Sequence, residues 1–332
     1  FQIQSYQMLY VEVQEMNRLS SFYLAMEEYI ARYLNTNEDC FFMWQVPATV
    51  MVGRNQLINN EVNLSYCHEN NIHVLRRKSG GGCIYVDKSC LLFSYITHDE
   101  QVNLVFSQYI NLIVEMLNKM GIAANAGGRN DVMIEDKKIS GNAFYHVPGR
   151  SIVHGTMLYD TDMENMVKSI TPSEEKLISK GVESVRQHIA LLKDFTTLSL
   201  EKFKQLTKQY LCSSELVLTT DDVKGIEEIE KDYLSDNFTF GNNPRYSISN
   251  KKHFDNVGNM EVYIQLKNDV IKHINILGDY FLTGDIDNQV LKPLQNIQYN
   301  EYEITAALPE NIGDIVRNLR KDQLIELIMA HP

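Results

Sequence analysis

Three consecutive glycines at positions 80–82 constrain this 332-residue chain more than any other feature. They follow Arg76-Arg77-Lys78-Ser79 and precede a β-like run. Each ordered glycine costs extra backbone entropy, so such a run is a poor filling for an ordinary loop. Bare backbone lets consecutive N–H groups form an anion-binding nest. Because the arginines add forked donors suited to carboxylates and phosphates, the segment predicts a pocket for an acidic ligand.

A second segment predicts a cation and a hydroxyl on one face of a strand. Residues 128–143 read Gly-Arg-Asn-Asp, a short apolar run, an acidic turn and Lys-Lys-Ile-Ser-Gly-Asn-Ala. Side chains alternate between the two faces of a strand, so Lys138 and Ser140 are expected on one face and Lys137 on the other. Gly141 would leave room beside them.

With two flanking segments, these stretches resemble the lipoate–protein ligase family. Gly53-Arg54-Asn55-Gln56 precedes them, and His154-Gly155-Thr156 follows them. The family pattern has an R-R-x-S-G-G-G loop, a G-R-N-D segment, a K-x-S-G-x-A lysine strand and an H-G-T strand, and all occur here in that order. Residues 173–185 and the Phe-Thr-Phe-Gly segment at 238–241 also look like this family. The resemblance therefore covers nearly the whole chain.

The resemblance implies an α+β fold with two domains. A mixed β-sheet catalytic domain of the biotin/lipoyl protein ligase type is expected over residues 1–246, and a small α+β accessory domain over residues 247–332. The chain is long enough for two domains. Gly241–Arg245 is the best linker candidate, and apolar alternation around Asn268-Asp269 predicts a hairpin beyond it.

Hydrophobic periodicity places the other elements. An amphipathic helix is expected over Leu19–Leu34, and a longer one runs from Val102 to Met120 and is ended by Gly121. Further helices are expected near residues 61–70, 163–170, 200–211, 290–297 and 312–328. Strands are expected near residues 40–45, 48–52, 73–76, 83–86, 91–96, 132–135, 138–145, 151–159, 262–266 and 271–276.

Composition argues against several classes of function. The net charge of −12 disfavours nonspecific nucleic-acid binding, which depends on phosphate neutralisation by Lys and Arg. No apolar run approaches the roughly eighteen residues of a membrane span, and no signal peptide is visible. The five scattered cysteines contain no CxxC pair, so neither a disulfide framework nor a zinc site is suggested. We therefore expect a protein of the reducing cytoplasm, without nucleic-acid or membrane partners.

The resemblance implies an ATP-dependent enzyme that activates lipoate to lipoyl-AMP and transfers the lipoyl group to a lysine of an acceptor protein. The implied partners are the lipoyl domains of 2-oxoacid dehydrogenase complexes and the glycine-cleavage H protein. Because this chemistry joins two anions, it needs positioning and charge compensation rather than an enzyme nucleophile. A magnesium ion, Mg²⁺, held by few carboxylates and several waters, would bridge phosphate oxygens.

By motif position, the resemblance makes Lys138 the catalytic lysine and Asp131 the magnesium ligand. The other matched residues are expected to bind lipoate or the adenylate: Arg77, Ser79, Gly80, Gly81, Gly82, Tyr85, Asp87, Asn130, Ser140, Gly141, Ala143, His154, Gly155 and Thr156. Plainer roles stay open, such as an Asx turn at Asn130-Asp131 and packing for His154. The single tryptophan, Trp44, could line the dithiolane end of the pocket or belong to the core.

The chain departs from the family after the glycine loop. Val86 stands where a histidine is usual, and Lys88-Ser89-Cys90 replaces a Leu-Gly-Asn-like turn. A degenerate lipoate-binding protein is therefore one alternative, although the retained lysine strand argues against it. Another is an octanoyl- or lipoyl-transferase of the same fold, which would use a cysteine thiolate. No cysteine follows Lys138 closely, but Cys83 and Cys90 lie in or beside the glycine loop. The sequence does not indicate the preferred acceptor, the choice between lipoate and octanoate, or the oligomeric state.

Overall fold

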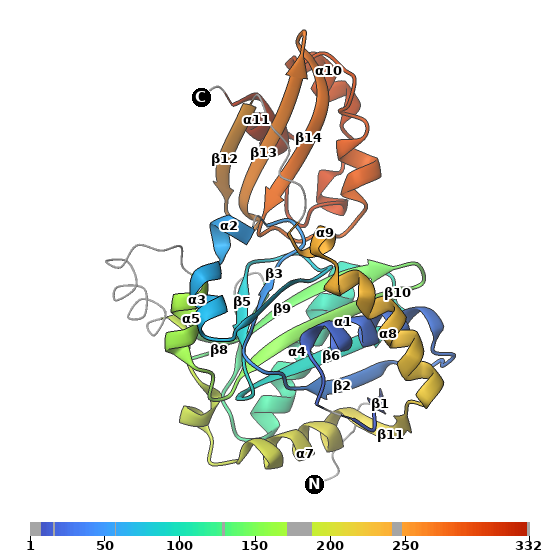
Figure 1. Ribbon diagram of the computed structural model, residues 1–332, viewed down its shortest axis with the longest axis vertical. Helices are drawn as coiled ribbons and strands as arrows, with labels where there is room; N and C mark the ends of the chain where they lie inside the picture. The colour runs from blue at the N-terminus through green and yellow to red at the C-terminus, as the bar shows by residue number, and fades with distance from the viewer. Residues whose placement is uncertain are drawn as a thin grey trace.

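The computed structural model describes residues 8–15, 17–56, 58–127, 130–170, 188–240 and 248–330, which form two units of mixed α and β structure (Figure 1). The larger unit contains an eight-stranded sheet in the order β11-β1-β2-β6-β10-β9-β8-β7, and the smaller one a three-stranded sheet. The predicted α+β class is confirmed. The predicted boundary at 246/247, the Gly241–Arg245 linker and the family-like residues 173–185 lie outside the described residues.

The large sheet is mixed. At one edge, β1 (Met8–Glu12) pairs in parallel with both β2 (Cys40–Trp44) and β11 (Cys212–Val217). The remaining strands run antiparallel to their neighbours: β6 (Cys90–Thr97), β10 (Arg150–Leu158), β9 (Lys137–Val147), β8 (Asp131–Ile134) and β7 (Asn125–Gly127). Every residue of β10 is buried, and the side chains of His154 and Thr156 are hydrogen-bonded inside the protein.

Helices cover both faces of this sheet, and the alternation along β2 shows why. Cys40, Phe42 and Trp44 face one apolar cluster, whereas Phe41 and Met43 face another. The first cluster contains α1 (Ser20–Tyr33) and, beside it, α8 (Thr220–Leu234). The second contains α4 (Val102–Lys119) and α7 (Leu200–Leu211). Shorter helices complete the unit: α2 (Ile58–Glu61), α3 (Leu64–Glu69), α5 (Met163–Ile170), α9 (Asp236–Thr239) and a 3-10 turn (Leu192–Phe195).

A small three-stranded sheet presents the glycine loop. Its central strand β3 (Thr49–Val52) lies between β4 (His73–Arg76) and β5 (Ile84–Val86). The loop of residues 77–83 joins the two outer strands and therefore passes the end of the central one. Val50, Val52 and Val86 are fully buried against the α1 side of the core. The loop is thus anchored on both sides.

The C-terminal unit stands apart at one end of the ribbon (Figure 1), and it has an apolar core of its own. Its antiparallel strands are β12 (Ile248–Phe254), β13 (Gly258–Lys267) and β14 (Val270–Gly278). Its helical segments are a π-helical turn (Asp287–Leu291), α10 (Glu301–Ala307), a 3-10 turn (Ile312–Asp314) and α11 (Lys321–Met329). Asn268 and Asp269 have φ of 53° and 58°, so the predicted hairpin turn is confirmed.

Most of the predicted elements are confirmed, but three predicted helices differ from the structure in their extent. The helix expected over 61–70 is split into α2 and α3, because the Asn63 side chain caps α3 by accepting from Tyr66 N. In place of the helix expected over 312–328, a 3-10 turn ends at Asp314 and α11 begins at Lys321, and Asn318 between them has a φ of +65°. Most of the helix expected over 290–297 consists of turns. In the described part of the chain, no helix is long and apolar enough to cross a membrane.

Candidate active site

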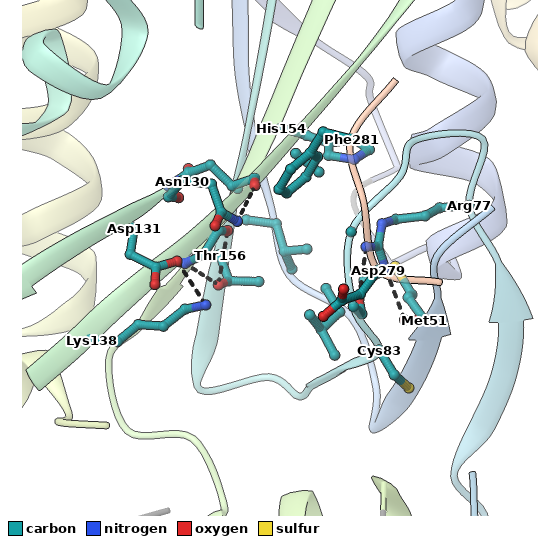
Figure 2. A pocket seen from close by; sticks show the side chains of 18 of the residues that line it. Met51, Arg77, Cys83, Asn130, Asp131, Lys138, His154, Thr156, Asp279 and Phe281 are labelled. Atoms are coloured by element: carbon teal, nitrogen blue, oxygen red, sulfur yellow. Dashed lines mark hydrogen bonds and ion pairs between the residues drawn. The ribbon is translucent and has the colours of Figure 1, made fainter. Parts of the chain in front are cut away.

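A cavity of about 240 Å³ lies between the glycine loop, strands β9 and β10, and the segment after β14 (Figure 2). Most of the residues singled out from the sequence line it: Arg77, Gly81, Gly82, Asn130, Asp131, Lys138, Gly141, Ala143, His154, Gly155 and Thr156. Apolar side chains of Leu24, Trp44, Met51, Ile84 and Leu92 line it as well. The cavity therefore combines an apolar lining with polar and charged groups, as an amphiphilic acid requires.

Lys138 and Asp131 form an ion pair inside this cavity. Lys138 Nζ lies 2.8 Å from Asp131 Oδ1, and the side chains are 33% and 24% exposed (Figure 2). A Cβ built on Gly141 would stand 2.8 Å from Lys138 Cε and Nζ, so the lysine stem crosses the glycine. The predicted room beside the lysine is confirmed, and it is created by the absence of a side chain at this position.

A bulge in the β8–β9 pair separates Lys138 from Ser140. Lys138 pairs with Met133 and Ser140 with Val132, so the residue between them is extra. Ser140 does not line the cavity, and its buried hydroxyl contacts the Asn142 side chain. The expectation that Lys138 and Ser140 both present side chains to the ligand is therefore wrong, because simple alternation does not pass through a bulge.

Asn130 ties the start of β8 to β9. Its Nδ2 donates to Asn142 O at 2.7 Å, and Asn142 N donates back to Asn130 O at 3.1 Å. This doubled contact fixes the backbone that carries Asp131. Asp131 Oδ1 is buried and, beyond the ion pair with Lys138, accepts no hydrogen bond from the described residues. A carboxylate that lines a cavity is the kind of ligand that a magnesium ion uses.

Arg77 is folded into the glycine loop rather than extended toward the cavity. Its Nη1 donates to Met51 O at 3.0 Å, and its Nη2 donates to Gly80 O at 2.7 Å and Gly82 O at 2.8 Å. Nε donates to Ser79 Oγ at 3.0 Å. Burial lowers the pKa of Arg77 to about 10, so the guanidinium stays charged at neutral pH. Arg77 therefore shapes the loop and adds fixed positive charge behind it.

Arg76 also uses its guanidinium to hold backbone carbonyls, those of the turn beside the glycine loop. Its Nη1 donates to the carbonyls of Gly53, Arg54 and Gln56 at 2.7–3.0 Å. Its Nε donates to the carbonyl of Phe238. Burial lowers the pKa of Arg76 as well. Arg76 does not line the cavity, and it holds the Gly-Arg-Asn-Gln turn beside the loop.

The glycines of the loop are required by close backbone packing. Gly81 has a φ of +85°. A Cβ on Gly53 would stand 2.0 Å from Gly81 O, and one on Gly80 would stand 2.5 Å from Tyr280 O. Gly81 N donates to Tyr280 O at 3.1 Å. The loop is therefore clamped between the Gly-Arg-Asn-Gln turn and the C-terminal unit, with bare backbone left toward the cavity.

Four of the expected ligand contacts do not line the cavity, besides Ser140. Ser79 is buried behind the loop, and Gly80 lines a neighbouring groove. Tyr85 is packed in the core. Asp87 accepts from the backbone N of Ser89 and Asp162, both at 2.8 Å, and burial raises its pKa. These four residues support the loop and its flanks rather than lining this cavity, and their expected contacts with a ligand stay predictions.

The sequence did not indicate the contribution of the C-terminal unit. Asp279 and Phe281 line the cavity, and Figure 2 shows Asp279 on the same side as Arg77 and Met51. The Phe281 ring stacks on Phe144 with centroids 5.8 Å apart. No local pattern predicts a contact between segments so distant in the chain. Trp44 lines the cavity and is also a buried core residue, and its place at the dithiolane end of a ligand stays a prediction.

The cysteines near the loop are poorly suited to nucleophilic catalysis. Cys83 lines the cavity, but burial raises the pKa of its thiol to about 12. Cys90 is fully buried, and burial raises its pKa further. Because the thiolate is the nucleophile, both residues are in the inactive form at neutral pH. The arrangement favours chemistry that uses charge and positioning.

Residues 20–212 match the family model described as the lipoyl protein ligase A/B catalytic domain, which spans more than half of the chain. This chain belongs to the lipoyl protein ligase A/B family. Residues 243–328 match a second model, the bacterial lipoate protein ligase C-terminus. The family resemblance found in the sequence is thus confirmed in both units.

Relatives support membership of the lipoyl protein ligase family over nearly the full chain. Lipoate–protein ligase 1 of Staphylococcus aureus is 33% identical over 307 residues, which cover 89% of this chain and 93% of the relative. The structure of P. falciparum LipL1 in complex with lipoate is similar with a TM-score of 0.73 at 20% identity, covering 96% of this chain and 97% of that one. The structure of lipoate–protein ligase A bound with ATP has a TM-score of 0.62 at 22% identity, covering 71% and 99%. These two structures share the fold.

Proposed function

We propose that this protein is an ATP-dependent lipoate–protein ligase. The observation that carries the proposal is one cavity that joins an apolar lining around Trp44 to the glycine loop and the Lys138–Asp131 pair, in a member of the lipoyl protein ligase family. The apolar lining suits the acyl chain and dithiolane of lipoate. The bare loop backbone suits its carboxylate and the α-phosphate of ATP.

In the proposed reaction, a lipoate carboxylate oxygen attacks the α-phosphorus of ATP, and pyrophosphate leaves. The amine of an acceptor lysine then attacks the acyl carbon of lipoyl-AMP, and AMP leaves. We assign Lys138 Nζ to screening the carboxylate from the phosphate and to stabilising the charge on the phosphate in both steps. The glycine loop orients the carboxylate, because Arg77 holds the carbonyls of Gly80 and Gly82 and Tyr280 O holds Gly81 N, so the loop backbone is fixed.

Asp131 would hold magnesium in this proposal. A bound magnesium ion neutralises phosphate charge and is usually held by one or two carboxylates with several waters. In the described residues, no cluster of three or more metal-ligating side chains occurs, so the substrate phosphates would supply the other ligands. Its ion pair with Lys138 keeps Asp131 oriented until the nucleotide arrives.

The proposed acceptors are the lipoyl domains of 2-oxoacid dehydrogenase complexes and the glycine-cleavage H protein, whose lysines would meet the adenylate. A cytoplasmic location belongs to the same proposal. It is supported by the five cysteines, all of which are free thiols, as expected in a reducing compartment.

Lipoate is expected to drive exchange of labelled pyrophosphate into ATP without any acceptor protein. The ligase mechanism forms lipoyl-AMP reversibly, whereas a thiol transferase or a lipoate-binding protein does not form it. Cys83→Ala should exchange at the wild-type rate to within about twofold, because a protonated thiol takes no part in adenylation. Absence of lipoate-dependent exchange in the wild-type protein would overturn the proposal, and loss of exchange in a folded Cys83→Ala would contradict the view that this thiol takes no part in adenylation.

The C-terminal unit is expected to move when the adenylate forms. Asp279 and Phe281 form part of the cavity wall, and the unit is bonded to the larger one by Gly278 N to Asn55 O at 2.8 Å and by Arg54 to Asp287 at 3.0 Å. The lysine of an acceptor protein must reach the adenylate in the cavity, where the C-terminal unit forms part of the wall. Formation of the adenylate should therefore favour an arrangement in which the C-terminal unit has moved away from the cavity. Small-angle scattering with a non-hydrolysable lipoyl-adenylate analogue should show a changed radius of gyration, and AMP alone should not. Identical profiles with and without the analogue would contradict the movement.

A further inference from the structure

Glu27 of α1 is a fully buried carboxylate that the proposed reaction does not use. Its two oxygens lie 3.0 and 2.9 Å from His154 Nδ1, and Ser94 Oγ lies 2.5 Å from Oε1. The Tyr145 hydroxyl is 3.5 Å from Oε2. A buried carboxylate is tolerated when it is hydrogen-bonded or paired. The partners of Glu27 come from β6, β9 and β10, strands that carry residues lining the cavity.

The first arm of this network runs from the glycine loop to Glu27, and Arg77 sets its direction. Arg77 Nε can only donate, so Ser79 Oγ accepts this bond at 3.0 Å. The Ser79 hydroxyl can then donate to His154 Nε2, which lies 2.7 Å away. An accepting Nε2 leaves the ring proton on Nδ1, which donates to Glu27. In this arrangement His154 accepts at Nε2 and carries its donated proton on Nδ1.

The second arm runs from the apolar lining to the same carboxylate. Trp44 Nε1 can only donate, and it bonds to Ser94 Oγ at 2.9 Å. The Ser94 hydroxyl then donates to Glu27. The indole lines the cavity and is stacked on Tyr23, with ring centroids 5.0 Å apart. Both arms thus end on one acceptor, with every proton directed toward Glu27.

We propose that Glu27 is a positioning residue that fixes the glycine loop and the Trp44 wall relative to each other. One arm holds the loop that orients the acid's carboxylate, and the other holds the indole against its chain. Because both arms end on the same buried carboxylate, the distance between the glycine loop and the Trp44 indole is fixed. A single acid can then contact the loop with its carboxylate and the indole with its chain at the same time. The identity of that acid, lipoate, rests on the proposed function, whereas the network itself does not.

The test is Glu27→Gln, which keeps the shape and changes one oxygen to an NH2 donor. Ser94 and His154 both donate a hydrogen bond to Glu27. In Glu27→Gln one of the two oxygens becomes an NH2 donor, so at least one of these two residues would face a donor instead of an acceptor. We expect the KM for lipoate in pyrophosphate exchange to rise about ten- to hundred-fold, the effect of one lost charge-assisted bond. The KM for ATP should stay within about twofold. Glu28→Gln is the matched control: its buried carboxylate makes ion pairs with Lys78 and Arg32 and does not line this cavity.

A spectroscopic readout separates positioning from simple packing. The ring nitrogens of His154 in 15N NMR should show Nδ1 protonated and Nε2 unprotonated in the wild-type protein, with altered shifts in Glu27→Gln. Ser94→Ala, a second variant that keeps the carboxylate, should leave the His154 shifts unchanged and still raise the KM for lipoate. A wild-type His154 protonated at Nε2 would overturn the inference, and so would an unchanged KM for lipoate in a folded Glu27→Gln. These shifts need no substrate, so they decide on Glu27 even if the wild-type protein fails to catalyse exchange, a result that would overturn only the proposed function.

Discussion

Replacing Lys138 with alanine is expected to reduce lipoyl transfer by at least about 10²–10³-fold, the usual effect of removing one preorganised charge-stabilising group. The amine is the only lysine nitrogen among the described residues that line the cavity, and it is held 2.8 Å from Asp131. Without it, a carboxylate and a phosphate must meet with no positioned cation between them. The side chain is 33% exposed and contributes little to the core, so the melting temperature should change by only a few degrees. Mass spectrometry of a lipoyl-domain acceptor measures the transfer.

Lys137→Ala is the matched control for this prediction. It removes the same charge from the adjacent position, and Lys137 does not line the cavity. We expect it to retain transfer to within a few-fold. Equal losses in the two variants would mean that Lys138 is wrongly assigned. Near-normal transfer by Lys138→Ala would contradict the role of this lysine in adenylation.

The sequence predicted the convergence of the site through its resemblance to the family, and two of the motifs lie on neighbouring strands. Lys138 and His154 lie on β9 and β10, which pair antiparallel, so their motifs face one another once the register is set. The glycine loop could be recognised from its composition alone. A side chain on Gly80 would collide with the backbone of Tyr280, and one on Gly53 of the neighbouring turn would collide with the backbone of Gly81 in the loop.

Other features of the site depend on contacts that no short segment encodes. The bulge in β9 changes which side chains reach the cavity, and it depends on the pairing with β8. Asp279 enters the site because the C-terminal unit packs on the loop, more than a hundred residues away in the chain. The role of Glu27 could not be predicted from the sequence for a similar reason. Its position in the helix is that of a core residue, and its hydrogen-bond partners lie on three separate strands.

Arg77→Lys is expected to destabilise the protein and to impair adenylation, although the charge is retained. The guanidinium serves three carbonyls and one hydroxyl at once. An ammonium is a compact charge with three donors on a flexible stem and cannot reproduce this fork. Each buried carbonyl left without a donor costs about 1–3 kcal/mol. At roughly 2–4 °C per kcal/mol, the melting temperature should fall by several degrees.

The same substitution should lower lipoate-dependent pyrophosphate exchange by about 10²-fold, because a misplacement of about 1 Å has an effect of this size. Arg320→Lys controls for the chemical change. Arg320 is exposed and forks onto Asp322, so its replacement should alter neither the melting temperature nor exchange.

These two measurements distinguish the structural role of Arg77 from direct binding of the substrate. If the guanidinium held the lipoate carboxylate itself, Arg77→Lys would raise the KM for lipoate while the free protein kept its melting temperature. If it holds the loop, stability and exchange must fall together, since Gly80 and Gly82 lose their donor before any ligand is present. A folded Arg77→Lys with an unchanged melting temperature would therefore contradict the structural role of Arg77 in the loop and would support direct contact of its guanidinium with the ligand.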